Sequence, residues 1–412
     1  MHVIPIRYSN MKKTLNNFIY NLDLSARYYK SLNDHHMAMY INQQLELLRD
    51  ITERKKDYLA ASYYVPSEIL SLFDCNAVYI EKIAGLAAAF RIIKNPVEES
   101  KRQGMSPDRC SYQVMFHLLM EGGVIPKPDC FAALSYACND AWMYCSETAK
   151  RSGVAYFHVD VPKIKGGSTP TQETYTYLAK QLEELYKQLK LRFPRKSGIS
   201  EVIENANQTL YIKRKIDTVR HENPECADVT DIFKIFTLYN DLGKKSTTQT
   251  INQFLNKITA GYIQNDKHSA RVLWLGIIPL YRNGIIKDIE NKLECKVVGE
   301  EMFDFTEVEL SYDTFFYDLA DRIISTRFFT NESRLDAIFK SARVLGVNGI
   351  IHFSHRNCRF LPSLVPSIRK KAKEENIAFV EIQGDAIDPC FFNEAEMWRR
   401  LEGFNEKLYR DK

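Results

Sequence analysis

The stretch NGIIHFSHRNC, residues 348–358, decides the fold class. Its β-branched run ends in a cluster of histidine, arginine and cysteine, and a predicted helix over 361–375 leads to a second apolar run, IAFVEI. Alternation of short apolar runs with helical segments is typical of βαβ units, which build parallel sheets. The same alternation begins at residue 270 with RVLWLGII. Residues 269–412 are therefore predicted to form an α/β domain.

The same alternation of short apolar runs and helical segments occurs over residues 59–168, in the runs NAVYI, CFAALSY and VAYFHVDVP. Helical spacing dominates residues 1–58 and 169–268, and the linker GGSTPTQ supplies Ser168 or Thr169 as the expected helix cap. We predict two Rossmann- or flavodoxin-like domains with parallel sheets, joined by a helical connector and preceded by a helical segment. A length of 412 residues fits this division.

The composition excludes several protein classes. Hydrophobic residues make up 45% of the chain and charged residues 26%, which argues against disorder. A net charge of +4 is too small to indicate a nucleic-acid-binding surface. The N-terminus lacks the apolar core of a secretory signal, and apolar runs such as AGLAAAF are far shorter than the ~20 residues a bilayer requires. A soluble, cytoplasmic protein without membrane contact is expected.

The cysteines form an odd-numbered set with no compact disulfide spacing, which favours buried thiols or metal ligands. Two of them, Cys138 and Cys358, directly follow predicted strands. A third, Cys110, follows Ser106 and Pro107, which are predicted as the cap and first residue of a helix. The full set is Cys75, Cys110, Cys130, Cys138, Cys145, Cys226, Cys295, Cys358 and Cys390.

These three cysteines share a structural context. Ligands of open parallel sheets bind beyond the carboxyl ends of the strands, and helix starts favour thiolate over thiol. Three thiolates from distant parts of the chain suit a soft metal or an iron–sulfur cluster better than a disulfide. Each cysteine taken alone is more often a small buried hydrophobe, and that alternative stays open here. Cys145, seven residues after Cys138 on the same helical face, is a weaker candidate.

Motifs of other chemistries are absent from the sequence. No C-x-x-C, H-E-x-x-H or G-x-S-x-G occurs. The segment DLGKKS at 241–246 resembles the end of a phosphate-binding loop, but the required upstream glycine is missing, so a solvated loop is predicted.

Five segments together resemble a known family. The segments, in chain order, are SPDRCSYQ, PDCFAALSYACNDAWMY, VAYFHVDVP, GIIHFSHRNC and FVEIQGDAIDPCFFNEAEMWRRLEGFNEKL. Over residues 58–408 they are similar, in the same order, to the iron–sulfur subunits of 2-hydroxyacyl-CoA dehydratases and benzoyl-CoA reductases. The resemblance implies a [4Fe–4S] cluster with Cys110, Cys138 and Cys358 as ligands. One iron then has no protein ligand, and such an iron is able to bind a substrate oxygen and pass it an electron.

The resemblance also implies an activity. A dehydratase of this family reduces a CoA thioester by one electron to a ketyl radical, which expels the neighbouring hydroxide and gives an enoyl-CoA. The expected partners are a homologous second subunit, an ATP-dependent iron–sulfur activator protein and the acyl-CoA substrate. Two alternatives stay open: a subunit of a benzoyl-CoA reductase-like enzyme, and a non-catalytic zinc or cluster protein that relays electrons.

A carboxylate is implied by the segment VYIEKIAGLAAA, which resembles the Y-x-E-x-x-A-x-x-A segment of the catalytic dehydratase subunit. Glu81, placed at the end of the strand NAVYI, would carry out acid–base chemistry. The alternative is a solvated carboxylate at the end of a strand. Relatives often have a serine where this chain has Tyr63, with Ser62 beside it, so substrate handling is expected to differ.

The loop after the apolar run NGIIHFS supplies cations. His355 and Arg356 are predicted to stabilise the reduced cluster or to hold a carbonyl oxygen or a CoA phosphate. His352 and Arg359 are weaker candidates, and a solvated loop is the alternative for Arg359. Asp385 and Asp388 are expected to shape the turn after the last strand, which leaves His355 and Arg356 as the residues of this region with a predicted catalytic role.

Overall fold

The strands form two separate parallel sheets. The computed structural model describes residues 8–164, 168–260, 270–282, 284–302 and 308–409. Within these residues the sheets have the strand orders β2-β1-β3-β4 and β6-β5-β7-β8, with every pair parallel. Each order is the 2-1-3-4 arrangement of flavodoxin-like folds. The predicted α/β class with two similar parallel sheets is confirmed.

The strands have four to seven residues each, and the longest helices have 24. The strands are β1 (Tyr58–Ala61), β2 (Asn76–Tyr79), β3 (Cys130–Leu134), β4 (Ala155–Val159), β5 (Ala270–Gly276), β6 (Cys295–Glu300), β7 (Gly349–His355) and β8 (Ala378–Gly384). The helices up to the second sheet are α1 (Tyr8–Ser31), α2 (His35–Thr52), α3 (Ser67–Ser71), α4 (Ile80–Ala89), α5 (Pro96–Arg102), α6 (Ser111–Glu121), α7 (Asn139–Ser152), α8 (Gln172–Arg192), α9 (Ile199–Glu222), α10 (Val229–Phe236), η1 (Thr237–Asp241) and α11 (Lys245–Ala260). The later helices are α12 (Ile285–Leu293), α13 (Phe315–Ile324), α14 (Asn331–Val344), η3 (Leu361–Leu364), α15 (Val365–Glu374), η4 (Pro389–Phe391) and α16 (Glu394–Leu408).

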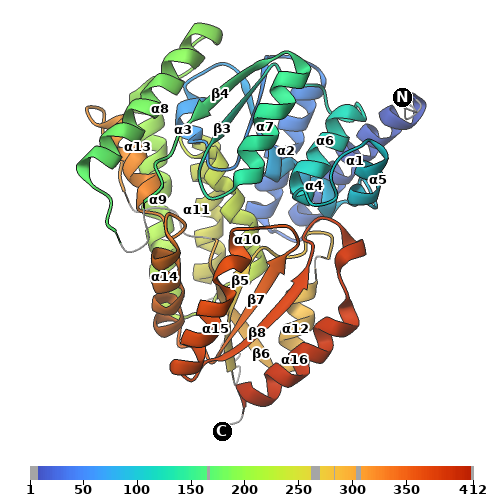
Figure 1. Ribbon diagram of the computed structural model, residues 1–412, viewed down its shortest axis with the longest axis vertical. Coiled ribbons are helices and arrows are strands. Elements are labelled where there is room, and N and C mark those ends of the chain that lie inside the picture. Colours follow the sequence, from blue (N-terminus) through green and yellow to red (C-terminus); the bar gives the residue numbers. More distant parts are fainter. Residues whose placement is uncertain (1–7, 165–167, 261–269, 283, 303–307, 410–412) are drawn as a thin grey trace.

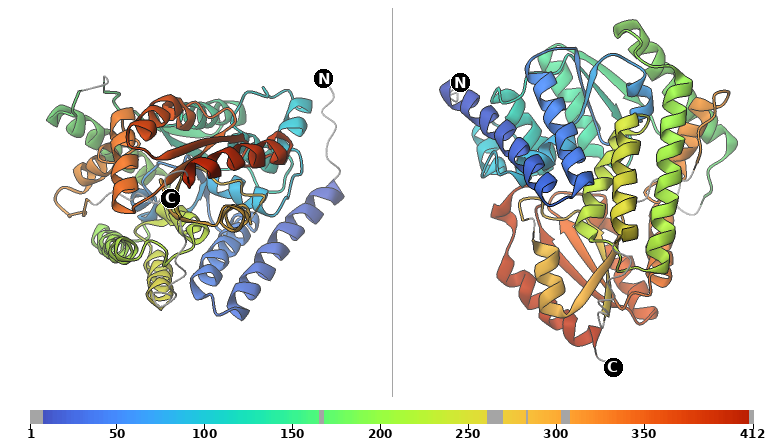
Figure 2. Two further views of the ribbon diagram at one scale, coloured as in Figure 1. Left: turned by 90° about the horizontal axis from the view of Figure 1, so that it is seen from below. Right: turned by 180° about the vertical axis from the view of Figure 1, so that it is seen from behind.

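The central strands β3 and β7 are buried along their whole length, because helices cover both faces of each sheet. Gly349 shows how closely these layers pack, since a Cβ at this position would lie 2.5 Å from the Phe404 ring of α16. In Figure 1 the two sheets lie one above the other, and Figure 2 shows α1 and α2 on the back of the molecule, beside α9 and α11.

Helix α8 begins later than predicted. Its cap is Thr171, whose side chain bonds reciprocally with Thr174, and not Ser168 or Thr169. Pro170 disfavours a cap at Ser168, because Thr169 would then need helical backbone, and the reciprocal bonds of Thr171 and Thr174 favour the later start over Thr169. The predicted boundary between residues 58 and 59 falls inside β1, and the one between 268 and 269 lies outside the described residues. The four-segment division of the chain stays a prediction.

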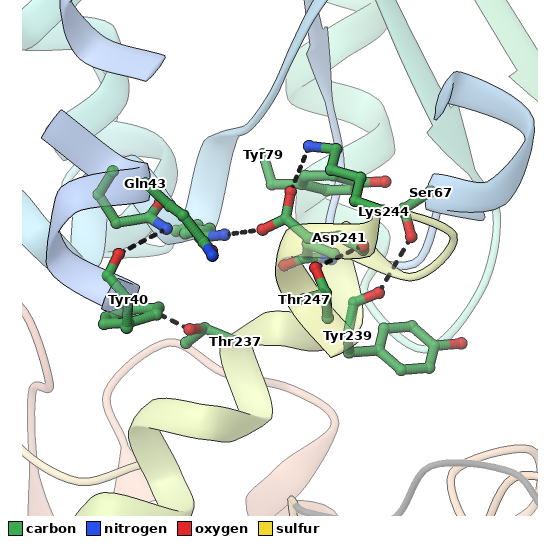
Figure 3. A network of polar contacts seen from close by, with 12 residues as sticks. Tyr40, Gln43, Ser67, Tyr79, Thr237, Tyr239, Asp241, Lys244 and Thr247 are labelled. Atoms are coloured by element: carbon green, nitrogen blue, oxygen red, sulfur yellow. Dashed lines mark hydrogen bonds and ion pairs between the residues drawn. The ribbon is translucent and has the colours of Figure 1, made fainter. Parts of the chain in front are cut away.

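The segment DLGKKS is not the solvated loop that was predicted. Asp241 is buried and its carboxylate is held between Lys82 and Lys244, while its carbonyl accepts a hydrogen bond from Thr247. Figure 3 shows this network where η1 meets α11. Gly243, with φ of +87°, turns the chain here, and a Cβ would approach Val202 to 2.7 Å. Packing between distant helices therefore buries a charge that its local sequence marks as exposed.

None of the described helices is both long enough and apolar enough to cross a bilayer.

Candidate functional site

A cavity of about 290 Å³ lies where the carboxyl ends of the two sheets meet. In each sheet the strand order reverses between the first and third strands, which is where ligands bind in this architecture. The cavity is lined from both switch points, by Ser62–Tyr64 after β1, Tyr136–Cys138 after β3, Ile277–Leu280 after β5, and His355 and Cys358 after β7. The two sheets thus contribute their equivalent loops to one site.

Gly276 sets the path of the loop after β5. Its φ is +83°, and a Cβ there would lie 2.4 Å from the carbonyl oxygen of Phe353. Only glycine tolerates this combination of positive φ and close backbone approach. The chain therefore leaves β5 at an angle that directs Ile277–Leu280 into the cavity.

The three predicted ligand cysteines all line this cavity. Cys110 and Cys138 are the N-cap residues of α6 and α7, and Cys358 lies between β7 and η3. The prediction that Cys110 occupies an early helical turn is wrong. Ser106 begins a turn instead, with Pro107 in its second position and the N–H of Arg109 bonded to the Ser106 carbonyl at 3.4 Å, and α6 starts only at Ser111.

Burial favours the thiol over the thiolate at these three cysteines, contrary to the expectation based on helix starts. Burial raises the pKa of all three, that of Cys138 to about 12, and outweighs the helix dipole. Nearby charge acts in the same direction, because the pKa of Cys110 is raised further by Cys138 and Cys358. A thiolate at Cys358 would therefore disfavour thiolates at Cys110 and Cys138, and a bound cation would offset this repulsion.

His355 has a fixed tautomer. Its Nδ1 accepts a hydrogen bond of 3.0 Å from the backbone N–H of Ala386, which is only able to donate. The proton of the neutral ring must then be on Nε2, which lies 3.6 Å from the sulfur of Cys110. A second donor, the backbone N–H of Leu361, lies 3.4 Å from the sulfur of Cys358. Two N–H groups are thus directed at the cysteine sulfurs.

Glu81 lies in the first turn of α4 and not at a strand end as predicted, because β2 ends at Tyr79 and the helix begins immediately. Nor is it solvated: Oε2 has no exposed surface, and Oε1 accepts a hydrogen bond of 2.9 Å from Gln113. Burial raises the pKa of Glu81 to about 7. The carboxyl group lines the same cavity as the three cysteines.

Arg356 lies on the other side of the loop. It lines a second, more polar cavity of about 510 Å³, which also contains Asn393, and it is not part of the wall of the first. Its guanidinium stacks on Phe391, 3.9 Å from the ring centroid. The structure therefore brings His355 to the cysteines but places Arg356 behind them.

The remaining polar residues of this region have structural surroundings. His352 is buried within β7, where its Nδ1 lies 3.0 Å from Ser354 Oγ, and Arg359 is exposed. The expected turn role of Asp385 and Asp388 is confirmed. Asp385 accepts the backbone N–H groups of residues 387 and 388, and Asp388 that of Cys390.

Comparison with known proteins decides the family. A family model described as "2-hydroxyglutaryl-CoA dehydratase, D-component" matches residues 62–408. The chain belongs to this family. The resemblance noted in the sequence, over residues 58–408, is thereby confirmed.

Three curated relatives of this dehydratase family are distant but cover most of the chain. The (R)-2-hydroxyisocaproyl-CoA dehydratase alpha subunit of Clostridioides difficile is 22% identical over 83% of this chain and 88% of its own length. The (R)-phenyllactyl-CoA dehydratase alpha subunit of Clostridium sporogenes is 23% identical over 84% and 88%. The lactoyl-CoA dehydratase subunit alpha of Anaerotignum propionicum is 20% identical over 83% and 88%.

Sequence reasoning missed several residues that hold the site of this D-component family member together. The backbone N–H of Cys110 donates to Asp140, and Asn357 donates to the carbonyl of Pro107, which ties the loops of two cysteines to each other. Arg334 forms two hydrogen bonds with Glu301, at 2.8 and 2.9 Å. It also donates to the carbonyl of Leu361, just beyond Cys358. Of these residues, only Asp140 had a local signal in the sequence, because it directly follows Asn139 at the start of a helix.

The buried pair Arg334–Glu301 should be important for stability. Burial would raise the pKa of Glu301, but the guanidinium holds it below its usual value. Arg334→Met leaves that carboxylate charged and unpaired, so we expect the free energy of unfolding to fall by about 3–5 kcal/mol. Denaturant unfolding of cluster-free protein measures this.

Two variants control this prediction. Arg359→Met removes an exposed arginine directly after Cys358 and should change the unfolding free energy by no more than about 0.5 kcal/mol. Combining Arg334→Met with Glu301→Leu removes both charges and should recover part of the loss. An Arg334→Met protein as stable as wild type would contradict the structural role.

Cys145 does not reach the cavity. It is completely buried in α7 and packs in the hydrophobic core. The cavity wall contains Cys110, Cys138 and Cys358 as its cysteines.

Proposed function

We propose that this chain is the [4Fe–4S]-binding, alpha-type subunit of a radical 2-hydroxyacyl-CoA dehydratase, which removes water from its substrate to give an enoyl-CoA. One observation carries the proposal: three cysteines from three separate loops line a single cavity together with a buried carboxyl group of raised pKa. Membership of the dehydratase family supports it.

The donor set fits a cluster better than a single ion. Among the described residues, Asp34, His36 and Asp231 form the group whose ligand atoms all lie within 4.8 Å of one another. The three cysteines do not form such a group, so at least one pair of their sulfurs is more than 4.8 Å apart. A single tetrahedral zinc would hold its sulfurs about 3.8 Å apart, given its bond length to sulfur. The N–H groups of His355 and Leu361, directed at two of the sulfurs, suit ligands that carry negative charge.

When bound, a [4Fe–4S] cluster would supply one electron to the thioester carbonyl of the substrate. Dehydration is not a net oxidation or reduction, so that electron is recovered in each turnover. The chain's own residues then determine which bonds break.

Glu81 is suited to protonate the hydroxyl group that leaves, and the carboxylate so formed can then accept the proton that the neighbouring substrate carbon loses, which regenerates the acid. A pKa of about 7 keeps part of the carboxyl population protonated at neutral pH, and the proton makes water the leaving group instead of hydroxide. Gln113 fixes the orientation of the carboxyl group through the hydrogen bond to Oε1. The cavity wall is largely apolar and includes the rings of Tyr63 and Tyr64. Such a wall excludes the water that would otherwise quench a radical.

His355 is a positioning residue for Cys110 in this proposal. Its Nε2–H donates toward the sulfur, and Ala386 holds the ring in that orientation. Donation to a thiolate stabilises its charge, so His355 would favour the reduced state of the bound group. Arg356, behind the loop, adds positive charge without lining the substrate cavity.

The alpha-type assignment implies an assembly. The curated relatives are named as alpha subunits of dehydratases. We extend this to a homologous second subunit and to an ATP-dependent iron–sulfur activator that delivers the first electron. The chain's nearest approach to a phosphate-binding loop, DLGKKS, has its aspartate buried in an ion-pair network, which supports a separate ATP-using protein.

Metal analysis and product analysis test the proposal. Anaerobically purified protein should contain iron and acid-labile sulfide in a ratio of about one. With its partner and activator it should convert a 2-hydroxyacyl-CoA into an enoyl-CoA. Zinc without labile sulfide would contradict the proposal, and conversion of benzoyl-CoA to a cyclic diene would identify a reductase instead.

A further inference from the structure

The cavity extends away from the cysteines into the helical part of the molecule. Beyond Glu81 its wall passes to Lys82 and then to residues of α1, α2, α10 and η1. A series of contacts joins Lys82 to Tyr40 and Tyr40 to Thr237. The ammonium of Lys82 lies 5.9 Å from the ring centroid of Tyr40, and the Tyr40 hydroxyl bonds Thr237 at 2.8 Å (Figure 3). We call the part lined by Tyr29, Tyr40, Phe233, Lys234 and Thr237 the outer arm.

The outer arm is mainly apolar but contains a few polar groups. Met37, Ile41 and Phe233 contribute apolar surface, and Tyr29 adds an aromatic ring. The hydroxyl groups of Tyr40 and Thr237 bond each other, and they retain lone pairs for a further donor. A wall of this kind suits a narrow, uncharged chain that contains occasional amide groups.

Lys234 places a positive charge in the outer arm. Its side chain is 32% exposed, and its ammonium lies 5.6 Å from the Tyr29 ring centroid. Within the described part of the chain, this ammonium donates a long hydrogen bond, of 3.4 Å, to the carboxylate of Asp231. An ammonium has three donors, so donors remain for a ligand.

Neighbouring groups do not neutralise Lys234 fully. Asp231 is already bound by the ammonium of Lys257 at 2.6 Å, and Lys257 also bonds Asp34 at 2.9 Å. His36 lies 2.7 Å from Asp34 and 3.9 Å from Asp231. Two carboxylates are therefore shared between Lys257, His36 and Lys234. A third, that of Asp228, also raises the pKa of Lys234, but it lies 3.6 Å from the ammonium of Lys287. The cation that occupies this acidic group is Lys257, which leaves Lys234 to face the cavity.

We propose that the outer arm receives the pantetheine chain of a CoA thioester and that Lys234 binds a phosphate of the CoA. The inference rests on the proposed function, because it requires a thioester whose carbonyl lies at the cysteine end. Pantetheine is flexible, uncharged and has two amide groups, which match the apolar wall and the Tyr40–Thr237 hydroxyl pair. The phosphates are anionic and need a cation beyond the end of that chain.

Binding of CoA alone tests this without turnover. Isothermal titration calorimetry would compare CoA with pantetheine, which lacks the phosphates, on anaerobically purified full-length protein. Lys234→Gln should weaken CoA binding about tenfold and leave pantetheine binding unchanged. Lys234→Arg keeps the charge and should stay within about threefold of wild type. CoA binding to wild type should weaken as salt is added.

The control is Lys370→Gln, which removes an 81% exposed lysine of α15 and should bind both probes as wild type does. Unchanged CoA affinity in Lys234→Gln would overturn the inference, and so would an equal loss for CoA and pantetheine. If Lys234→Gln instead impairs only substrates with a carboxylate at the end of the acyl chain, the outer arm holds the acyl group and the inference also fails. Absence of iron or of enoyl-CoA would refute the proposed function but not the dependence of CoA binding on Lys234.

Discussion

Replacing Cys358 by alanine should leave the protein folded but unable to retain iron. Cys358 is partly buried, and its sulfur accepts the N–H of Leu361, so the alanine variant loses one weak hydrogen bond. The two remaining cysteines are the N-cap residues of α6 and α7 in the first α/β unit. The second unit would then provide no cysteine in the cavity wall to bind the proposed cluster. Iron and labile sulfide should fall below roughly a tenth of the wild-type content, and dehydration should be lost.

A matched set of cysteine variants makes this result specific. Cys145→Ala removes a thiol that is completely buried in α7, and Cys390→Ala removes an exposed one. Both should retain the wild-type iron content, because neither residue lines the cavity. Circular dichroism of each variant checks that the fold is kept. A Cys358→Ala protein with full iron and sulfide would remove this residue from the ligand set.

Much of this site was predictable because the rule that locates it is local. Cys138 and Cys358 follow apolar runs that could only be central strands, and the carboxyl ends of parallel strands are where ligands bind. Both units have the same strand order, and the loops at their two switch points line one cavity. Cys110 lines the same cavity as the other two, but its predicted place within a helix is wrong, because Ser106 and Pro107 favour a turn as strongly as a helix start.

Tertiary packing determines the features that were not predictable. Glu301 and Arg334 are separated by 33 residues, and no local pattern indicates that they pair beneath the Cys358 loop. The burial of Glu81 depends on Gln113 of another helix, and the burial of Asp241 depends on Lys82. Burial also reverses the expected ionisation of the cysteines, because desolvation exceeds the effect of a helix start.

Replacing Glu81 by glutamine should lower kcat/KM for dehydration by about 10²–10⁴ while iron content stays at the wild-type level. Glutamine keeps the size of the side chain and the contact with Gln113, but it is unable to deliver a proton. As an acid with a pKa of about 7, Glu81 should make the wild-type rate decline as pH rises through neutrality. The residual rate of Glu81→Gln should lack that decline.

Stability gives an independent measurement of the same proton. The folded-state pKa of Glu81 is raised above its usual 4.5, so the folded protein binds this proton more tightly than the unfolded chain does. The favourable contribution is complete below pH 4.5 and is lost as pH rises through about 7. Across that window, cluster-free wild type should lose up to roughly 3 kcal/mol relative to Glu81→Gln.

Denaturant unfolding of both cluster-free proteins at pH 5 and pH 8 separates the two roles of this carboxyl group. If the stability difference appears but the rate does not fall in Glu81→Gln, the group is buried and neutral but delivers no proton, and the acid must be sought elsewhere in the cavity wall. If neither effect appears, Glu81 is ionised and solvated in solution. Only both effects together, with iron content unchanged, support a buried acid acting on the substrate beside the three cysteines.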